Sequence, residues 1–231
     1  NLAACLAEAG KRVLLVDLDP QGNTTSGIGG SAGAHSVYEA LMGRTPLSAC
    51  LQSTCVKGLS LIPADIRLAG AELELVELER REYRLKHLLK TIEGDFDFLF
   101  VDCPPSLGLL TVNALTAAQR VLIPIQCEYY ALEGVSSLMN TVNRVKHAFN
   151  PGLDIEGVLL TMLDARTNLG IQVVDSVKKH FKSRVFATAI PRNVRLGEAP
   201  SPALPIHLYD PRSLGADSYR RLAQEFLQRN R

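Results

Sequence analysis

The chain has no tryptophan, few aromatic residues and no long uninterrupted hydrophobic run. Its apolar runs are much shorter than the roughly 20 residues that a membrane-spanning helix requires. Its cysteines, Cys5, Cys50, Cys55, Cys103 and Cys127, are odd in number and match no zinc-ligand spacing. We therefore expect no membrane span, disulfide framework or zinc site, and we expect free thiols in a reducing cytosol.

The formal net charge is only +1, but the charged residues are unevenly distributed along the chain. Residues 1–163 hold 13 Lys and Arg against 18 Asp and Glu, a net charge of −5. Residues 164–231 hold 12 against 6, a net charge of +6. This asymmetry favours an anionic partner for the C-terminal third, and a basic surface without a partner is the equal alternative.

Short apolar runs alternate with helical patterns along the whole chain of 231 residues. We expect strands at 13–16, 59–62, 96–101, 121–125, 155–162 and 185–190. We expect helices at 36–43, 65–92, 108–118, 131–149, 169–181 and 213–229, with the second of these broken once, and a long loop at 191–209. This alternation predicts a single α/β domain, 1–231, with a mostly parallel twisted sheet covered by helices on both faces.

The first residues already carry a helical pattern. Leu2, Ala3 and Leu6 fall on one helix face, and Gly10 supplies a stop signal. Because a natural start seldom falls inside a helix, we expect that residues preceding Asn1 belong to the same domain.

Two predicted strands end in acidic residues. The run 13–16 is followed by Asp17 and Asp19, and the run 96–101 is followed by Asp102. Ligands of such sheets bind beyond the carboxyl ends of the strands. Residues two apart in an extended chain point to the same side, so Asp17 and Asp19 should face one crevice, where Mg²⁺ suits their oxygens. For Asp102 a helix-capping or turn role is an open alternative.

Longer stretches identify a resemblance to the ParA/Soj family of partitioning ATPases, which have a deviant Walker A motif and belong to the MinD-like superfamily. The stretches are KRVLLVDLDPQGN at 11–23, FLFVDCPPS at 98–106, PIQCEYYALEG at 124–134, LLTMLDARTN at 159–168 and IPRNVRL at 190–196. They occur in order and cover essentially the whole chain. The resemblance implies a P-loop NTPase-like fold.

The resemblance also implies an activity and partners. Members of this family hydrolyse ATP with Mg²⁺, form a homodimer on binding ATP, and bind DNA without sequence preference. A ParB-type centromere-binding protein stimulates hydrolysis. We therefore expect a cytoplasmic, nucleoid-associated ATPase with no membrane partner.

Family roles transfer to the three acids in the matching stretches. Asp19 would position the hydrolytic water, Asp17 would support the metal and phosphate shell, and Asp102 would hold Mg²⁺ through water.

Five further residues match positions with assigned roles in the family. Pro191, Arg192 and Asn193 lie where the family contacts the adenine. Arg166 and Arg195 lie where the family has DNA-binding arginines. Both arginines fall within the basic C-terminal third.

The family's first strand and its Lys-rich phosphate loop have no counterpart between residues 1 and 231. We expect that roughly 20 residues before Asn1 would supply this strand and loop. Because that strand should be central, the sheet of residues 1–231 should have a gap with unpaired backbone. Without the loop's backbone N–H groups and lysines, residues 1–231 alone should neither hydrolyse ATP nor bind it with micromolar affinity in calorimetry.

Three alternatives remain. A MinD-type membrane-associated ATPase would need an amphipathic C-terminal tail, and the last helix here is predicted to pack instead. An iron–sulfur ATPase would need cluster cysteines, for which Cys103 and Cys127 are the candidates. A non-enzymatic DNA-binding paralogue would lack the phosphate loop altogether.

Overall fold

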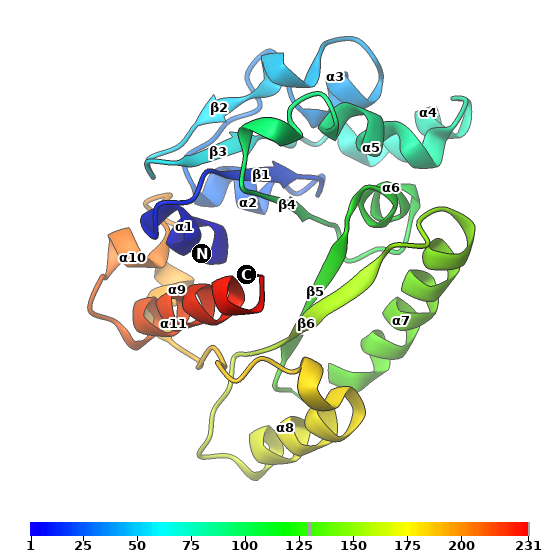
Figure 1. The fold of residues 1–231 in the computed structure, drawn as a ribbon. Helices are drawn as coiled ribbons and strands as arrows, with labels where there is room; N and C mark the ends of the chain where they lie inside the picture. The colour runs from blue at the N-terminus through cyan, green and yellow to red at the C-terminus, as the bar shows by residue number, and fades with distance from the viewer. Residues whose placement is uncertain (129–130, 231) are drawn as a thin grey trace.

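A computed structural model of the protein describes residues 1–128 and 131–230 (Figure 1). Tyr129 and Tyr130 of the family-like stretch 124–134 lie outside the described residues. The helices are α1 (Leu2–Glu8), α2 (Asn23–Gly27), α3 (Val37–Leu41), α4 (Leu68–Val76), α5 (Arg84–Leu89), α6 (Leu109–Ala117), α7 (Ala131–Ala148), α8 (Asn168–Phe181), α9 (Val194–Glu198), α10 (Ile206–Tyr209) and α11 (Leu214–Arg229). The strands are β1 (Val13–Asp17), β2 (Gln52–Ser53), β3 (Leu59–Ile62), β4 (Phe98–Asp102), β5 (Arg120–Gln126) and β6 (Asp154–Thr161).

The described strands form two sheets, of order β2-β3-β1-β4 and β5-β6. Strand β1 runs parallel to both β3 and β4, and β5 runs parallel to β6. Only the short β2 is antiparallel, against β3. Segment 185–190 extends the second sheet, because Val185 bridges Val158 and the amide of Ile190 donates to the carbonyl of Leu160.

No described strand pairs with the outer edge of β4 or with the facing side of β5. These two strands diverge in Figure 1, and a cleft of about 560 Å³ is lined partly by Leu99 and Val101 of β4 and by Ala118 and Gln119 before β5. The side chains of β4 are half-buried from Phe98 to Val101. The lack of pairing between β4 and β5 among the described residues agrees with the gap expected in the sheet.

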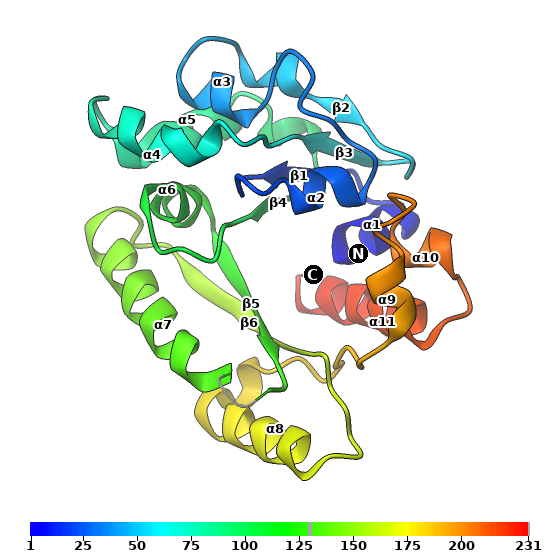
Figure 2. The ribbon, with the colours of Figure 1, turned by 180° about the vertical axis from the view of Figure 1, so that it is seen from behind.

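Strand β1 explains how the helices come to lie on both faces of the first sheet. Leu14 and Val16 pack into a core with α3, α4, α5 and α6. Val13 and Leu15 point the other way, into a core with α1 and α11. Alternate side chains of a strand point to opposite faces, so a continuous apolar run is buried on both. Figure 2 shows the two helical layers on either side of β1, which confirms the predicted α/β architecture.

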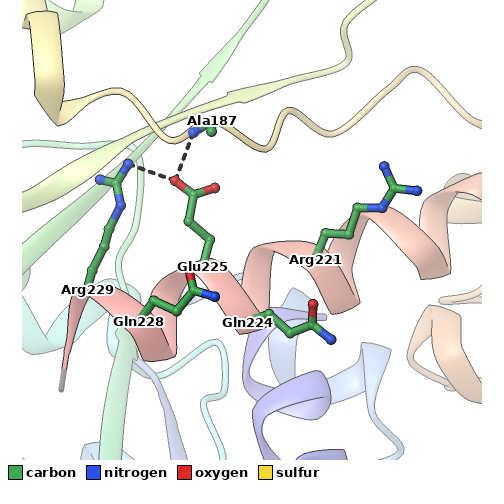
Figure 3. A pocket seen from close by; sticks show the side chains of 6 residues that line it. All are labelled: Ala187, Arg221, Gln224, Glu225, Gln228 and Arg229. Atoms are coloured by element: carbon green, nitrogen blue, oxygen red, sulfur yellow. Dashed lines mark hydrogen bonds and ion pairs between the residues drawn. The ribbon is translucent and has the colours of Figure 1, made fainter.

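Helix α11 fixes the outer segment of the second sheet. Figure 3 shows Glu225 reaching from α11 to segment 185–190. Its carboxylate accepts the amides of Ala187 and Thr188, each at 2.8 Å, and pairs with Arg229 at 2.7 Å. Ala216, Leu222 and Phe226 of this helix are also buried in hydrophobic clusters, so the last helix packs against the domain, as the sequence predicts.

The irregular segments agree with the sequence prediction in one place and differ from it in another. The break expected in region 65–92 is present between α4 and α5, where Arg80 has a positive φ of 50°. The expected loop 191–209 contains α9, capped by the Asn193 side chain, and α10, which follows Pro205. These helices are too short to show a recognisable hydrophobic period. No helix among the described residues is both long enough and apolar enough to cross a membrane.

Candidate functional site

The acid-bearing ends of β1 and β4 lie side by side. Asp17 and Asp102 are direct partners in the parallel register of these strands. The pairing continues one residue further, because the amide of Leu18 donates to the carbonyl of Asp102 at 2.8 Å. Asp19 follows at once. The structure therefore brings together the three acidic residues that the sequence singled out.

Asp17 is completely buried and is bound by its own chain. Its Oδ1 accepts the amide of Asp19 at 3.1 Å, and its Oδ2 accepts the amide and the hydroxyl of Thr25 at 2.8 and 2.7 Å. Burial raises the pKa of Asp17 above its usual value, and the Thr25 hydrogen bonds oppose that shift. The expectation that Asp17 and Asp19 both face one crevice is wrong for Asp17, since its side chain is buried with Oδ2 bound by Thr25 of α2 and Oδ1 bound by the amide of Asp19.

Thr25 is a further residue of the site that the sequence did not predict. It is 5% exposed, and its hydroxyl also accepts the amide of Ala64, just after β3, at 3.0 Å. The sequence signal for Thr25 is the pair Thr24-Thr25, which comes shortly after Gly22. In the structure Gly22 has a left-handed φ of 63°, which permits the turn into α2. Hydroxyl side chains in such a turn often bind nearby backbone and acids.

Asp102 is exposed, and its Oδ2 accepts the hydroxyl of Thr24 at 2.6 Å. Oδ1 accepts no hydrogen bond from the described residues. These contacts do not show Asp102 capping the next helix, because Gly108 is the N-cap residue of α6 and the amide of Leu110, in its first turn, donates to Glu72. Asp102 therefore has an oxygen directed to solvent at the strand ends.

Asp19 is half-buried, and its Oδ1 accepts the amide of Gln21 at 3.0 Å. Within the described residues, no three His, Cys, Asp or Glu side chains are clustered closely enough to hold a metal by themselves. Asp102 nevertheless fits Mg²⁺, which typically takes one or two carboxylates and completes its shell with water and substrate phosphates. Asp19 lies at the same strand ends.

Cys103 lies next to these acids. Burial, followed by the charges of Asp102 and Asp19, raises the pKa of its thiol to about 12. A thiol in this environment stays protonated, so it is a poor nucleophile and a poor metal ligand. Cys127 is a buried free thiol whose pKa is also raised by burial. Neither environment favours the iron–sulfur alternative.

Pro191, Arg192 and Asn193 lie beyond the carboxyl end of β6. Pro191 forms a parallel bridge with Leu163, and the amide of Arg192 donates to the Leu163 carbonyl at 3.0 Å. Asn193 caps α9 by accepting the amide of Arg195 at 2.9 Å. The position, at a strand end, is suitable for a ligand. Their contact with an adenine stays a prediction.

Arg192 extends from the same segment to Glu128, with which it pairs at 2.7 Å. This ion pair is about half exposed on both sides, at 56% and 52%. It links the end of β5 to the segment after β6.

Arg166 and Arg195, the two predicted DNA-binding arginines, are exposed. The Arg166 side chain is 88% exposed and forms a fork on Asp164, with the closer contact at 2.8 Å. Its guanidinium lowers the pKa of Asp164 to about 2. Arg195 pairs with Glu198 at 2.8 Å and with Asp210 at 3.4 Å. Both arginines are thus accessible but already face carboxylates.

Comparison with known proteins gives consistent results. Residues 1–155 match the AAA domain family AAA_31. The sporulation initiation inhibitor protein Soj of Bacillus subtilis is 59% identical over 227 residues, covering 97% of this chain and 90% of Soj. The chromosome partitioning protein ParA of Myxococcus xanthus is 50% identical over 232 residues, covering 100% of this chain and 82% of that protein.

Solved structures share the fold. A cobyrinic acid a,c-diamide synthase from Mycobacterium smegmatis, with bound ADP and magnesium, has a TM-score of 0.85 at 41% identity, covering 98% of this chain and 86% of that one. The septum site-determining protein MinD of Pyrococcus horikoshii, complexed with Mg-ADP, has a TM-score of 0.81 at 21% identity, covering 97% and 86%, a likeness of fold alone. On the strength of the Soj and ParA matches, this chain belongs to the ParA/Soj family of chromosome-partitioning proteins.

Proposed function

We propose that this protein is a partitioning ATPase, whose domain 1–231 uses ATP and Mg²⁺ to control binding to DNA. The observation that carries the proposal is the set of three acids at the paired ends of β1 and β4, in a chain 59% identical to Soj. A 41% identical protein of known structure binds ADP and magnesium, which supports the same nucleotide and metal here. The reaction converts ATP and water into ADP and phosphate.

Each acid has a distinct part in this reaction. Asp102 would hold the metal through water with Oδ1, which accepts no hydrogen bond from the described residues, and a metal held there would neutralise charge on the phosphates. Asp19, half-buried beside it, orients the attacking water. Asp17 does not touch the substrate, because it has no exposed surface. Pro191, Arg192 and Asn193 contact the adenine at the end of β6.

Arg166 and Arg195 bind DNA by exchanging their intramolecular carboxylates for backbone phosphates. Exposed ion pairs of this kind contribute about 0–1 kcal/mol, so a phosphate displaces them at little cost. Such contacts carry no sequence information and weaken steeply with salt. The protein would therefore associate with the nucleoid in the cytoplasm, as a homodimer on ATP, with a ParB-type protein stimulating hydrolysis.

A second candidate function comes from the Mycobacterium smegmatis structure, whose name specifies amide formation on cobyrinic acid. The higher identity to Soj, 59% against 41%, favours partitioning. Incubation with cobyrinic acid, glutamine and ATP distinguishes the two, because partitioning predicts no diamide product.

The proposed function is tested on the complete protein with Mg²⁺ and ATP, with and without DNA, at two salt concentrations. We expect ATP hydrolysis, and DNA binding that requires ATP and weakens at the higher salt concentration. Absence of ATP hydrolysis in the presence of Mg²⁺, DNA and a cognate ParB-type protein would refute the proposal. Sedimentation with anionic liposomes tests the MinD-type alternative, and ATP-dependent co-sedimentation would favour it.

A further inference from the structure

We propose that Thr24 and Thr25 are positioning residues for ATP hydrolysis, holding Asp19 and Asp102 in place from one short segment. This inference rests on the proposed ATPase function. The two threonines are adjacent in the chain, yet their hydroxyls bind acids on different strands, Asp17 on β1 and Asp102 on β4. Segment 23–27 thereby links the ends of neighbouring strands.

Thr25 is the buried member of the pair. Its hydroxyl donates to Asp17 at 2.7 Å and accepts the amide of Ala64 at 3.0 Å, so one oxygen joins the ends of β1 and β3. Its amide makes a second bond to Asp17 at 2.8 Å. A buried carboxylate costs several kcal/mol to desolvate unless it is hydrogen-bonded. Asp17 and Thr25 therefore form a rigid anchor.

The anchor holds the segment that carries Asp19. Asp17 begins this segment and Thr25 closes it, and the other oxygen of Asp17 also accepts the amide of Asp19 itself at 3.1 Å. The backbone of Asp19 is thus fixed from the same buried carboxylate that Thr25 binds. Asp17 and Thr25 act on the reaction through the position of Asp19, without touching the substrate.

Thr24 is the half-buried member, and it acts on Asp102. Its hydroxyl donates to Oδ2 of Asp102 at 2.6 Å, which fixes the rotation of that carboxylate. The orientation leaves Oδ1 directed away from Thr24 and free of hydrogen bonds from the described residues. Thr24 therefore presents the oxygen that would accept a metal-bound water.

The first test compares Thr25→Val with Thr25→Ser in the complete protein. Valine keeps the shape of threonine but removes both bonds of the hydroxyl, whereas serine retains them. Because a misplacement of about 1 Å can cost about 100-fold in rate, we expect Thr25→Val to lower kcat by about 10- to 100-fold while the Kd for ATP stays within about threefold. Thr25→Ser should restore turnover.

Amide hydrogen exchange without nucleotide supplies a readout that does not depend on hydrolysis. The amides of Asp19, Gln21 and Thr25 should exchange faster in Thr25→Val than in wild type, and at the wild-type rate in Thr25→Ser. Unchanged exchange, unchanged kcat in Thr25→Val, or equal loss of kcat in both variants would overturn the inference. A wild-type protein that fails to hydrolyse ATP would instead overturn the proposed function, and the exchange result would then decide only whether Thr25 holds the segment of Asp19 in place.

The second test uses Thr24, whose half-buried position makes a folding defect less damaging than at Thr25. Thr24→Val should raise the Mg²⁺ concentration needed for half-maximal ATP binding in calorimetry by about 10-fold, the lower end of typical outer-shell effects on metal affinity. Thr24→Ser should leave it unchanged. An identical Mg²⁺ requirement in Thr24→Val and wild type would contradict the role of Thr24. This test can be made even if Thr25→Val fails to fold.

Discussion

Asp17, at the acidic end of β1, and the arginines of the basic C-terminal third hold their charges in opposite ways. Asp17 is buried, and its carboxylate accepts hydrogen bonds from uncharged donors of its own segment, the amide of Asp19 and the amide and hydroxyl of Thr25. Arg166 and Arg195 are exposed and face carboxylates across ion pairs. The first arrangement fixes a geometry before any ligand binds. The second keeps charges available for exchange with another anion.

The difference follows from solvent. A buried charge must be satisfied locally, so removing its partners is costly. An exposed ion pair is screened and worth little, so breaking it is cheap. We therefore expect changes at the acidic end to affect stability and turnover, and changes in the basic region to affect binding with little effect on stability.

The largest expected effect on stability is at Asp17. Asp17→Ala leaves the amides of Asp19 and Thr25 without their acceptor inside the protein. We expect it to lower the free energy of unfolding by about 2–4 kcal/mol. Denaturation with urea measures this value. The matched variant Arg166→Ala, at the exposed pair, should change it by less than about 0.5 kcal/mol. Equal effects of the two variants on the free energy of unfolding would contradict the expected difference between the buried acid and the exposed ion pair.

Reversal of charge at Arg195 should give the next largest effect, on DNA binding. Arg195→Glu removes one phosphate contact and adds repulsion, so we expect an affinity loss of about 10-fold at low salt and a smaller salt slope. Electrophoretic mobility shifts at several salt concentrations measure both quantities. ATP binding should be unchanged.

The control for Arg195→Glu is Arg221→Glu, the same charge change on α11. Arg221 is 70% exposed and pairs with Asp217, and Figure 3 shows it directed away from the Glu225 contact. It is not a predicted DNA contact, so its loss of affinity should be clearly smaller. Equal losses from both variants would mean that net charge alone, without a localised site, binds DNA.

The smallest expected effect is a pH dependence at His207. This side chain is 5% exposed, and burial lowers its pKa below 6.5, with Glu8 opposing the shift and Arg220 adding to it. The unfolded chain then binds the proton more readily than the folded chain. Stability is therefore complete above pH 6.5 and falls as the pH drops below it.

His207→Gln should remove this dependence. We expect the free energy of unfolding to fall by about 1 kcal/mol or less between pH 7 and pH 5 because of His207, and the variant to show a correspondingly flatter profile. Urea denaturation across this range measures it. A profile as steep in the variant as in wild type would assign the dependence to other groups.

The regular part of the fold was predictable because apolar runs such as 13–16 fix both a strand and its burial on two faces. The gap beside β4 was predictable too, from the resemblance to a family with a further central strand. Strand β2 was not predictable, because it is only Gln52–Ser53 and is defined by its pairing with β3. Short helices such as α9 depend on a cap and on packing, which a periodic pattern does not reveal.

The acids of the site were predictable from their place after buried strands, whereas their environments were not. Alternation along a strand predicted that Asp17 and Asp19 share a crevice, but the chain turns after Asp17 and buries it under Thr25. Hydroxyl partners such as Thr24 carry little signal in sequence, since threonine is common in turns for local reasons. Long-range hydrogen bonds, here between residues 24 and 102, become visible only in the folded chain.

Asp19→Ala in the complete protein tests the central claim most directly, by following ATP hydrolysis and DNA retention in the same sample. Asp19 is assigned to the attacking water and not to binding, so the variant should bind ATP, dimerise and remain on DNA. Its hydrolysis rate should fall by at least about 100-fold, the scale of a lost catalytic group. Hydrolysis at the wild-type rate, with DNA released as in wild type, would contradict the assignment of the acidic strand ends to catalysis.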